Sequence, residues 1–245
     1  MTKPNDAKLE ILADPEVLAR RVADWLLGLA TAKQGVFSVA LSGGSTPRRL
    51  YELLAASPRR NAFPWARTHW FWGDERFVAH DDPQSNYLMV REAMLSQVPI
   101  PGGNIHSVPT IVATPEEAAK IYEQDLKAFY GADVLEVERP LFDVVLLGLG
   151  VDGHTASLFP NTKVLEVRDR WVAAVTDGTA EARVTLTYPA LESSQHVAFL
   201  ITGDEKRDVF NRLRHGDADV PAARLHPVGE LIWFVDTAAA SGVPS

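Results

Sequence analysis

Seven short apolar runs dominate the pattern of hydrophobic and polar positions along the chain. They cover residues 36–41, 68–72, 142–149, 172–175, 184–187, 197–201 and 231–235. Most are nearly continuous in Val, Ile, Leu, Phe and Trp rather than alternating, which is typical of strands that are buried on both faces of a parallel sheet. The runs therefore predict the strands of a mostly parallel sheet covered on both sides.

Helical patterns lie between these runs. Asp14, followed by Pro and Glu, predicts a helix start with an N-cap, a proline in the first helical position and an acid in the first turn. Thr114 predicts a second start as part of a capping box, and Thr46 repeats the N-cap and proline pair. Strands that alternate with helices predict an α/β fold, a Rossmann-like, doubly wound, mostly parallel sheet flanked by helices. The chain lacks a convincing linker, so we expect a single domain over residues 1–245.

Composition narrows the class of protein. Apolar residues make up 46% and charged residues 23% of the chain, which are ordinary values for a globular protein. No apolar run reaches the roughly 18 residues that span a bilayer, and the polar start carries no apolar signal core. The chain has no cysteine, which excludes disulfides and thiolate catalysis and makes the reducing cytoplasm the expected location. The formal net charge of −8 argues against nucleic acid or an anionic membrane as the main partner.

Polar and glycine-rich segments follow four of the predicted strands. They cover residues 42–47, 73–76, 148–157 and 202–207. In a doubly wound sheet, ligands bind beyond the carboxyl ends of the strands. We therefore expect these four segments to form the functional site.

The first segment, residues 42–47, has the sequence Ser-Gly-Gly-Ser-Thr-Pro. Its glycines allow close backbone approach, and the helix that is predicted to follow offers free N–H groups and a dipole that favours an anion. We interpret the segment as a phosphate-binding loop. The alternative is a plain strand-to-helix turn with Thr46 as its N-cap.

Charged residues outside this loop are open to two interpretations. Asp74, Glu75 and Arg76 directly follow an apolar run, so they either serve the site or form a solvated loop or a structural ion pair. Lys206, near a predicted helix start, either pairs with a phosphate or is a solvated helical lysine. Arg183 precedes the run at 184–187, and the pattern alone does not assign it.

The third segment contains glycines in the order Gly-x-Gly-x-x-Gly. We reject a dinucleotide site because Pro160 comes seven residues after the last glycine, where such a site needs a sustained helix. What remains is Asp152 with His154, and a histidine whose tautomer is set by a neighbouring carboxylate is the usual general base. The alternative is an isolated surface histidine. The sequence carries neither a His-Glu-x-x-His metal motif nor a Gly-x-Ser-x-Gly nucleophile motif, so we expect no metal site.

Together these segments resemble the 6-phosphogluconolactonase family, within the wider group that includes the glucosamine-6-phosphate deaminases. The matching segments are residues 41–47, 72–78, 85–87, 148–160, 183–187, 203–206 and 233–239. The block Asp-Gly-His-Thr-Ala-Ser-Leu-Phe-Pro at 152–160 is highly specific, whereas Ser-Gly-Gly-Ser marks the wider group. The resemblance implies a Rossmann-like domain that needs no cofactor and hydrolyses 6-phospho-D-glucono-1,5-lactone to 6-phosphogluconate in the oxidative pentose phosphate pathway.

The resemblance also implies roles for particular residues. His154, Asp152 and Asp74 are expected at the reacting end, with His154 as the general base that activates water. The expected substrate- and phosphate-binding residues are Ser42, Gly43, Gly44, Ser45, Thr46, Arg76, Arg183 and Lys206, of which Arg76 is also a candidate to stabilise the oxyanion. The expected partner is a small sugar-phosphate lactone, with no nucleic acid and no membrane, and the expected state is a monomer or a small homo-oligomer.

Two other functions stay open from the sequence. The related deaminases carry a glutamate after their Asp-Gly-His block, in a Phe-Asn-Glu-Pro stretch, whereas this chain has Leu158, Phe159 and Pro160 without an acid. That difference favours the lactonase over a glucosamine-6-phosphate deaminase or isomerase. The second alternative, a non-catalytic sugar-phosphate-binding protein, would normally carry a DNA-binding domain, for which this acidic chain has no room.

Overall fold

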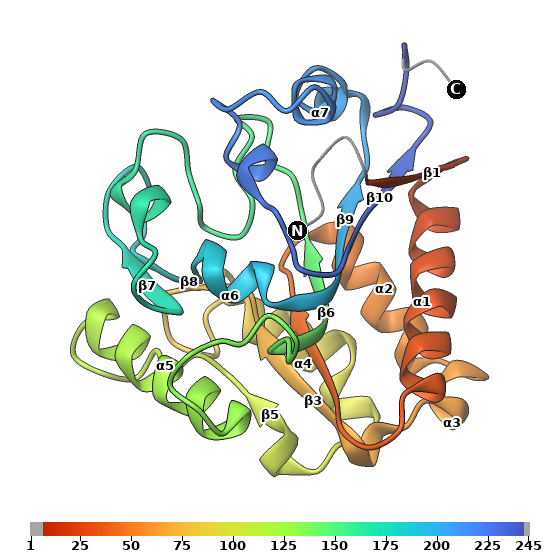
Figure 1. The fold of residues 1–245 in the computed structure, drawn as a ribbon. Helices are drawn as coiled ribbons and strands as arrows, with labels where there is room; N and C mark the ends of the chain where they lie inside the picture. Colours follow the sequence, from red (N-terminus) through yellow and green to blue (C-terminus); the bar gives the residue numbers. More distant parts are fainter. Residues whose placement is uncertain (1–6, 243–245) are drawn as a thin grey trace.

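The computed structural model describes residues 7–242 and shows an α/β arrangement (Figure 1). Its strands are β1 (Lys8–Leu12), β2 (Phe37–Leu41), β3 (Thr68–Trp72), β4 (Asp74–Arg76), β5 (Ile105–His106), β6 (Phe142–Leu147), β7 (Val172–Val175), β8 (Arg183–Leu186), β9 (Ser194–Ile201) and β10 (Glu230–Asp236). Its α-helices are α1 (Pro15–Ala32), α2 (Ser45–Ala55), α3 (Arg59–Ala62), α4 (Asn86–Ala93), α5 (Pro115–Tyr130), α6 (Tyr188–Glu192) and α7 (Arg207–Arg214).

The main sheet is parallel throughout. Within residues 7–242, its seven strands lie in the order β1-β10-β9-β6-β2-β3-β5. From β2 the chain adds β3 and β5 on one side, and it then returns to the other side of β2 to add β6, β9 and β10. The order therefore reverses between β2 and β6, which is the kind of switch point where doubly wound sheets bind ligands. The predicted Rossmann-like, mostly parallel α/β fold is confirmed.

Five of the predicted apolar runs form central strands of this sheet. The runs at 36–41, 68–72, 142–149, 197–201 and 231–235 correspond to β2, β3, β6, β9 and β10, with ends that differ by a few residues. The pattern did not predict β1 and β5 at the two edges. β5 has two residues and β1 is only partly buried, so neither strand shows the continuous apolar run of a central one.

The runs at 172–175 and 184–187 are also strands, but the prediction that they belong to the parallel sheet is wrong. They form β7 and β8 of a separate antiparallel sheet with the order β4-β8-β7. Only residues 176–182 connect them, which is too short for a crossover between parallel strands. The segment 73–76, expected as a loop, supplies β4, because Asp74 and Arg76 lie opposite Thr185 and Arg183 of β8.

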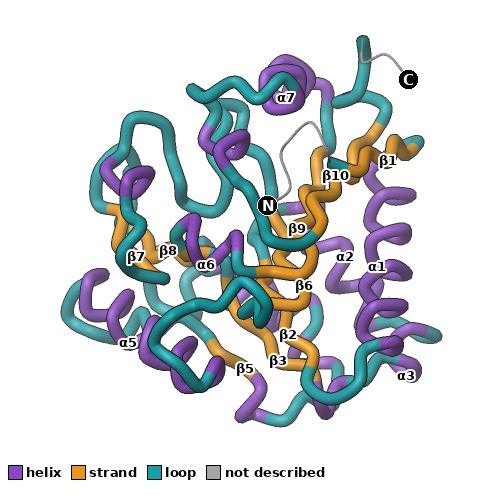
Figure 2. The backbone as a smooth tube through the Cα atoms, viewed as in Figure 1, coloured by secondary structure: helices purple, strands orange, loops and turns teal. Residues whose placement is uncertain are grey.

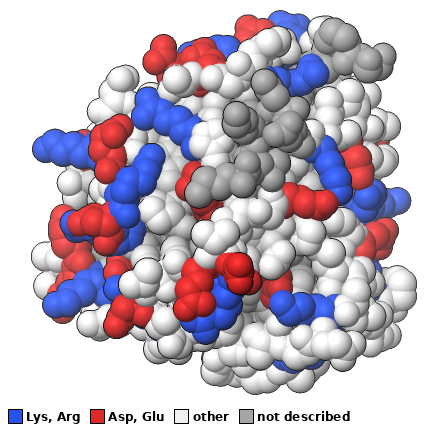
Figure 3. Space-filling view, viewed as in Figure 1, with Lys and Arg blue, Asp and Glu red and all other residues white. Residues whose placement is uncertain are grey.

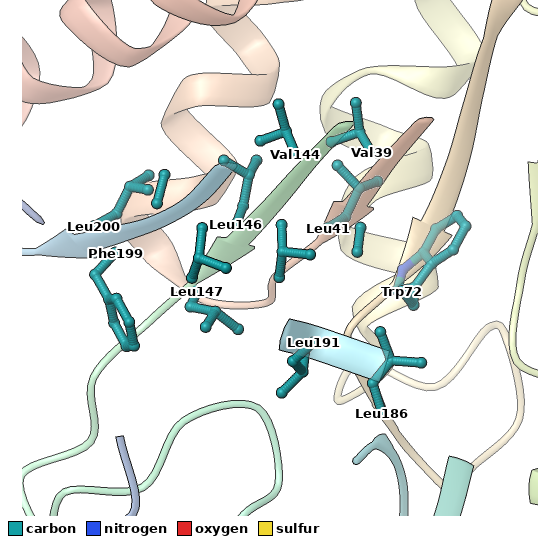
Figure 4. Packing of buried hydrophobic residues seen from close by; sticks show 14 of the residues in the cluster. Val39, Leu41, Trp72, Val144, Leu146, Leu147, Leu186, Leu191, Phe199 and Leu200 are labelled. Carbon is teal, nitrogen blue, oxygen red and sulfur yellow. The ribbon is translucent and has the colours of Figure 1, made fainter. Parts of the chain in front are cut away.

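Helices cover both sides of the main sheet (Figure 2). On one side α1 packs against α2 and β10, and on the other α5 packs against β7 and β8 of the small sheet. Figure 4 shows side chains of β2, β6 and β9 together with Leu186 of β8 and Leu191 of α6. These residues belong to one buried apolar cluster. Apolar packing therefore holds the small sheet beside the carboxyl ends of the large one.

Two of the three predicted helix starts are confirmed. The Asp14 carboxylate accepts a hydrogen bond from the Val17 N–H at 2.8 Å, at the start of α1. The Thr114 hydroxyl accepts one from the Glu117 N–H at 3.1 Å, at the start of α5. In both helices a proline follows the cap, as the sequence pattern predicted.

The third predicted start, with Thr46 as the N-cap, is wrong. α2 begins two residues earlier than predicted, at Ser45 instead of Pro47, and Gly44 is the N-cap. Thr46 lies inside the first turn of α2, and its hydroxyl is hydrogen-bonded to the Thr202 hydroxyl at 2.8 Å. Gly44 has no side chain, and the first N–H groups of α2 therefore stay available to a ligand.

The surface shows no segregation of charge on the face in Figure 3, where basic and acidic side chains are intermixed. In the described part of the chain, the helices are too short or too polar to cross a membrane.

Candidate active site

The four polar segments follow β9, β6, β2 and β3, which are adjacent strands of the main sheet. Because the strands are parallel, their carboxyl ends meet at one edge, and the segments enclose a cavity of about 370 Å³. The cavity lining includes every predicted site residue except Asp152, and it also includes Asn86, Thr202 and Glu205. Residues that are far apart in the sequence are thus brought to the switch point of the fold.

A buried tyrosine fixes the beginning of the loop at 42–46. The Tyr51 hydroxyl, from α2, donates to the Ser42 carbonyl at 2.8 Å and accepts from the Ser42 N–H at 3.0 Å. Burial raises the pKa of Tyr51, so the hydroxyl keeps its proton and both bonds. The loop turns from β2 into α2 at a defined place, with the N-terminus of α2 at the cavity. Free N–H groups and the helix dipole make this end suited to an anion.

Lys206 lies at the same end of the cavity. It closes the short 3₁₀ helix Asp204–Lys206, which leads into α7. A buried carboxylate, that of Asp236 at the end of β10, accepts from the Gly203 N–H at 3.1 Å and from the Ala239 N–H at 2.8 Å. Together with the bond between Thr46 and Thr202, these contacts hold the Lys206 segment beside the loop at 42–46.

His154 and Asp152 form a pair on another part of the cavity wall. The Asp152 carboxylate lies 2.5 Å from His154 Nδ1 and also accepts from the His154 N–H at 3.1 Å. Burial opposes ionisation of Asp152, but the bonds and charge of His154 outweigh it and lower the pKa of the carboxyl. A carboxylate at Nδ1 selects the tautomer in which Nε2 is the free base. His154 lines the cavity, so that nitrogen is available to a bound substrate or water.

Gly150 allows the His154 ring to lie against the backbone. A Cβ atom at Gly150 would lie 2.1 Å from His154 Nδ1 and 2.6 Å from the Asp152 carboxylate. No side chain fits there without displacing the pair. The glycines of this segment thus serve the histidine and not a dinucleotide, and in place of a sustained helix the segment continues into a turn that closes between Thr155 and Leu158.

Phe159 contacts both His154 and Arg183. Its ring centroid lies 4.4 Å from that of the imidazole, with 36° between the planes. The Arg183 guanidinium carbon lies 5.3 Å from the same centroid. One aromatic ring therefore packs against the predicted base and against a cation of the site. The sequence pattern assigned no role to Phe159, because its contact with Arg183 of β8 has no local sequence signature.

Two arginines lie opposite each other on β4 and β8. Arg76 and Arg183 form a cross-strand pair, and like charges in that position repel each other. Burial lowers the pKa of Arg183, and Arg76 lowers it further against the attraction of Asp74. Within residues 7–242, Arg183 Nε is buried without a hydrogen-bond partner. An anion in the cavity would relieve this unfavourable arrangement.

Asp74 is buried beside these arginines. One of its carboxylate oxygens accepts from the Ser157 hydroxyl at 2.6 Å and lies 3.9 Å from an Arg183 nitrogen. The Ser157 N–H in turn donates to the Thr185 hydroxyl at 3.2 Å. The segment at 150–160 is thereby fastened to the small sheet, and Asp74 presents a fixed carboxylate to the cavity.

Asn86, at the first position of α4, lines the cavity and was not among the predicted site residues. Its side-chain amide donates to the Asp74 carbonyl at 3.0 Å, and its side-chain oxygen accepts from Arg76 at 3.4 Å. A Cβ atom at Gly43 would lie 2.1 Å from that oxygen. Asn86 therefore packs directly on the predicted phosphate loop, which explains why a glycine is needed at residue 43. The only sequence signal for Asn86 was its place in the segment 85–87.

The arrangement combines an anion-binding end and a general base in one cavity. Three basic side chains, Arg76, Arg183 and Lys206, and the N-terminus of α2 face the same space as His154. Such a site can hold a small phosphorylated molecule and deprotonate a water molecule beside it.

Comparisons with known proteins identify the family of the chain. A family model described as glucosamine-6-phosphate isomerases/6-phosphogluconolactonase matches residues 13–233. A 6-phosphogluconolactonase of Nostoc sp. is 44% identical over 237 residues, which cover 94% of this chain and 96% of that protein. A solved structure of a 6-phosphogluconolactonase from Trypanosoma cruzi has a TM-score of 0.85 and 30% identity, and the match covers 98% of this chain and 97% of that chain.

A monomeric glucosamine-6-phosphate deaminase shares the same fold. Its TM-score is 0.81 at 20% identity, and the match covers 96% of this chain and 99% of that chain. At this level of identity the likeness concerns the fold alone. The residues of the site, and not the fold, therefore distinguish the activities.

Proposed function

The chain belongs to the glucosamine-6-phosphate isomerase/6-phosphogluconolactonase family, and from that premise we propose that it hydrolyses 6-phospho-D-glucono-1,5-lactone to 6-phosphogluconate. One observation carries the proposal. The Asp152 carboxylate lies 2.5 Å from His154 Nδ1. The N-terminus of α2 and Lys206 line the same cavity as this histidine. A base and an anion site that share one small cavity suit a phosphorylated substrate that reacts with water.

The phosphate binds at the loop of residues 42–46. The N–H groups at the start of α2 and the hydroxyls of Ser42, Ser45 and Thr46 contact its oxygens. Lys206 and Arg183 neutralise its charge. This end holds the substrate so that its lactone carbonyl lies near His154.

His154 acts as the general base. Neutral Nε2 takes a proton from water, and the water oxygen forms a bond to the lactone carbonyl carbon. Asp152 orients the imidazole and stabilises its charged form. Arg76 stabilises the oxyanion. The bond from carbon to the ring oxygen then breaks, the ring oxygen takes the proton from the imidazolium, and the carboxylic acid that forms ionises.

Asp74 serves the substrate hydroxyls or the attacking water rather than acting as the primary base. Its carboxylate already accepts a bond from Ser157 and lies near Arg183. It is thus held as an acceptor on the cavity wall, whereas His154 has a free ring nitrogen.

The residue before Pro160 argues against deamination. The related deaminases carry a glutamate before the corresponding proline, and this chain carries Phe159, whose ring packs on His154. An aromatic ring supplies no proton, so the acid–base chemistry of ring opening and ammonia release lacks a partner at this position.

The test is to supply the protein with the lactone and, separately, with glucosamine 6-phosphate. We expect 6-phosphogluconate to form well above the rate of the buffer alone, and no ammonia. Ammonia release without lactone hydrolysis would replace the proposal with the deaminase. Binding of 6-phosphogluconate without turnover of either substrate would favour a sensor. The pathway, the cytoplasmic location, the monomer or small homo-oligomer, and the lack of a cofactor, metal or nucleic-acid partner stay predictions.

A further inference from the structure

Glu75 is a buried acid that the proposed mechanism does not use. Its two carboxylate oxygens accept hydrogen bonds from the N–H groups of Arg76, Asn86 and Tyr87 at 2.7–2.8 Å. A fourth bond comes from the Ser85 hydroxyl at 3.2 Å. Burial raises the pKa of Glu75 to about 7, although these hydrogen bonds act in the opposite direction. An acid retained at such a position needs an explanation, because burying a charge is unfavourable.

The strand alternation of β4 places Glu75 behind the cavity wall. Asp74 and Arg76 line the cavity, and in a strand the residue between them points to the opposite face. On that face Glu75 meets the N-terminus of α4, where it takes the N–H groups of Asn86 and Tyr87. One carboxylate thus fastens the strand that carries two site residues to the helix that carries a third.

Asn86 transmits this attachment to the cavity. Its side chain bonds to the Asp74 carbonyl and to the Arg76 guanidinium, and it packs on Gly43 in the phosphate loop. The position of the Asn86 side chain depends on where α4 begins. That position is set by Glu75, together with the Ser85 hydroxyl that accepts from the Leu88 N–H.

We propose that Glu75 is a positioning residue, which acts through Asn86 to align Arg76 and the phosphate loop at residue 43 for substrate. The inference rests on the proposed lactone hydrolysis for its kinetic readout. It predicts that Glu75 and Asn86 act as one unit and not as two independent contributions to stability.

The test is a double-mutant cycle with Glu75→Gln and Asn86→Ala. Compared with ionised Glu75, the Gln side chain has the same shape but presents a donor where an N–H group of the helix also donates, so the start of α4 loses an acceptor. We expect each single variant to lower kcat/KM about tenfold, through kcat because of Arg76 and through KM because of the phosphate loop, and the double variant to lose little more than the worse single variant. Losses that multiply, or a Glu75→Gln variant within about twofold of wild type, would overturn the inference.

The matched control is Glu117→Gln, which changes an acid at the N-terminus of α5 that bonds to the Ala113 N–H. We expect this variant to keep the kinetic constants of wild type. If Glu75→Gln does not fold, the cycle is run with Glu75→Asp, which keeps the charge but withdraws the carboxylate from α4.

The same cycle is measured as the Kd for 6-phosphogluconate, to separate this inference from the proposed function. A wild type that binds this probe but does not hydrolyse the lactone would contradict the proposed function, and coupled losses of binding would still support the inference. If wild type hydrolyses the lactone but the losses in the two single variants are independent of each other, the proposed function would stand and the inference would be overturned.

Discussion

At one end of the cavity, residues 42–46 and the first turn of α2 form a single stretch of chain. At the other end, side chains from β4, β8 and the segment 150–160 meet through contacts between separate segments. The first end is proposed to recognise an anion largely with backbone groups, which any sequence that folds into this turn will offer. The second end depends on His154, Asp152 and Asp74 being held in one arrangement.

This difference determines how each end tolerates change. Loss of one side chain at the anion end leaves the helix N-terminus and its N–H groups in place, so we expect weaker binding and continued turnover. Loss of one side chain at the reacting end removes a group that nothing else replaces. We therefore expect variants at the two ends to separate into effects on KM and effects on kcat.

The largest effect is expected for His154→Ala. Without the imidazole no base takes the proton of water, and kcat should fall on the order of 10²- to 10⁴-fold. Binding of 6-phosphogluconate, measured by calorimetry, should survive because the anion end is unchanged. The control is His215→Ala, at the end of α7 and outside the cavity. Activity of His154→Ala within a few-fold of wild type would remove His154 from the mechanism.

A smaller effect, on KM instead of kcat, is expected for Lys206→Met. Its ammonium group offers charge-assisted hydrogen bonds to the phosphate, so its loss should raise KM roughly 10- to 100-fold and leave kcat nearly unchanged. Lys120→Met on α5, outside the cavity lining, is the matched control. A variant with normal KM and reduced kcat would place Lys206 at the wrong end of the cavity.

Phe159→Leu should have an intermediate effect at the reacting end. The ring that contacts His154 and Arg183 is lost while the apolar character stays, and we expect kcat to fall about tenfold, in line with the contribution of aromatic contacts. Phe159→Tyr keeps the ring and should restore most of the activity. Steady-state kinetics of both variants checks this, and equal losses in the two would show that the ring contacts do not matter.

The smallest effect concerns stability and its dependence on pH. The pKa of Glu75 in the folded protein, about 7, lies above its ordinary value of 4.5, so the folded chain keeps a proton that the unfolded chain releases. Stability from this group is greatest below that ordinary value and is lost as the pH rises through the folded pKa. The side chain in Glu75→Gln does not titrate. The amount by which the unfolding free energy of this variant falls below that of wild type should therefore shrink between about pH 5 and about pH 8. Urea unfolding at both pH values measures this, and a deficit that grows would contradict the raised pKa.

Local sequence signals predicted the fold and the part of the site that is one continuous stretch of chain, residues 42–46. The apolar runs of β2, β3, β6, β9 and β10 and the caps of α1 and α5 depend on residues that are close in sequence, so their patterns predict them directly. The segments after the strands could be located from the rule for doubly wound sheets. Ten of the predicted site residues lie at the cavity, and Asp152 contacts it through His154.

What the sequence did not predict depends on partners far apart in the chain. The Thr46 hydroxyl bonds to that of Thr202 instead of capping α2. Asp74 lies in a strand because β8 pairs with it. The roles of Asn86 and Phe159 likewise depend on contacts across segments. Such contacts leave no local pattern, since each residue type is compatible with many surroundings.

The central claim, that one cavity joins an anion site to a general base, is tested most directly by comparing two substrates. The rates of hydrolysis of the 6-phosphorylated lactone and of the unphosphorylated lactone are measured side by side, after subtraction of the rate in buffer alone, for wild type, His154→Ala and Lys206→Met. We predict that wild type strongly prefers the phosphorylated lactone, that His154→Ala slows both, and that Lys206→Met slows the phosphorylated lactone alone. Equal rates of wild type on both lactones would contradict the account.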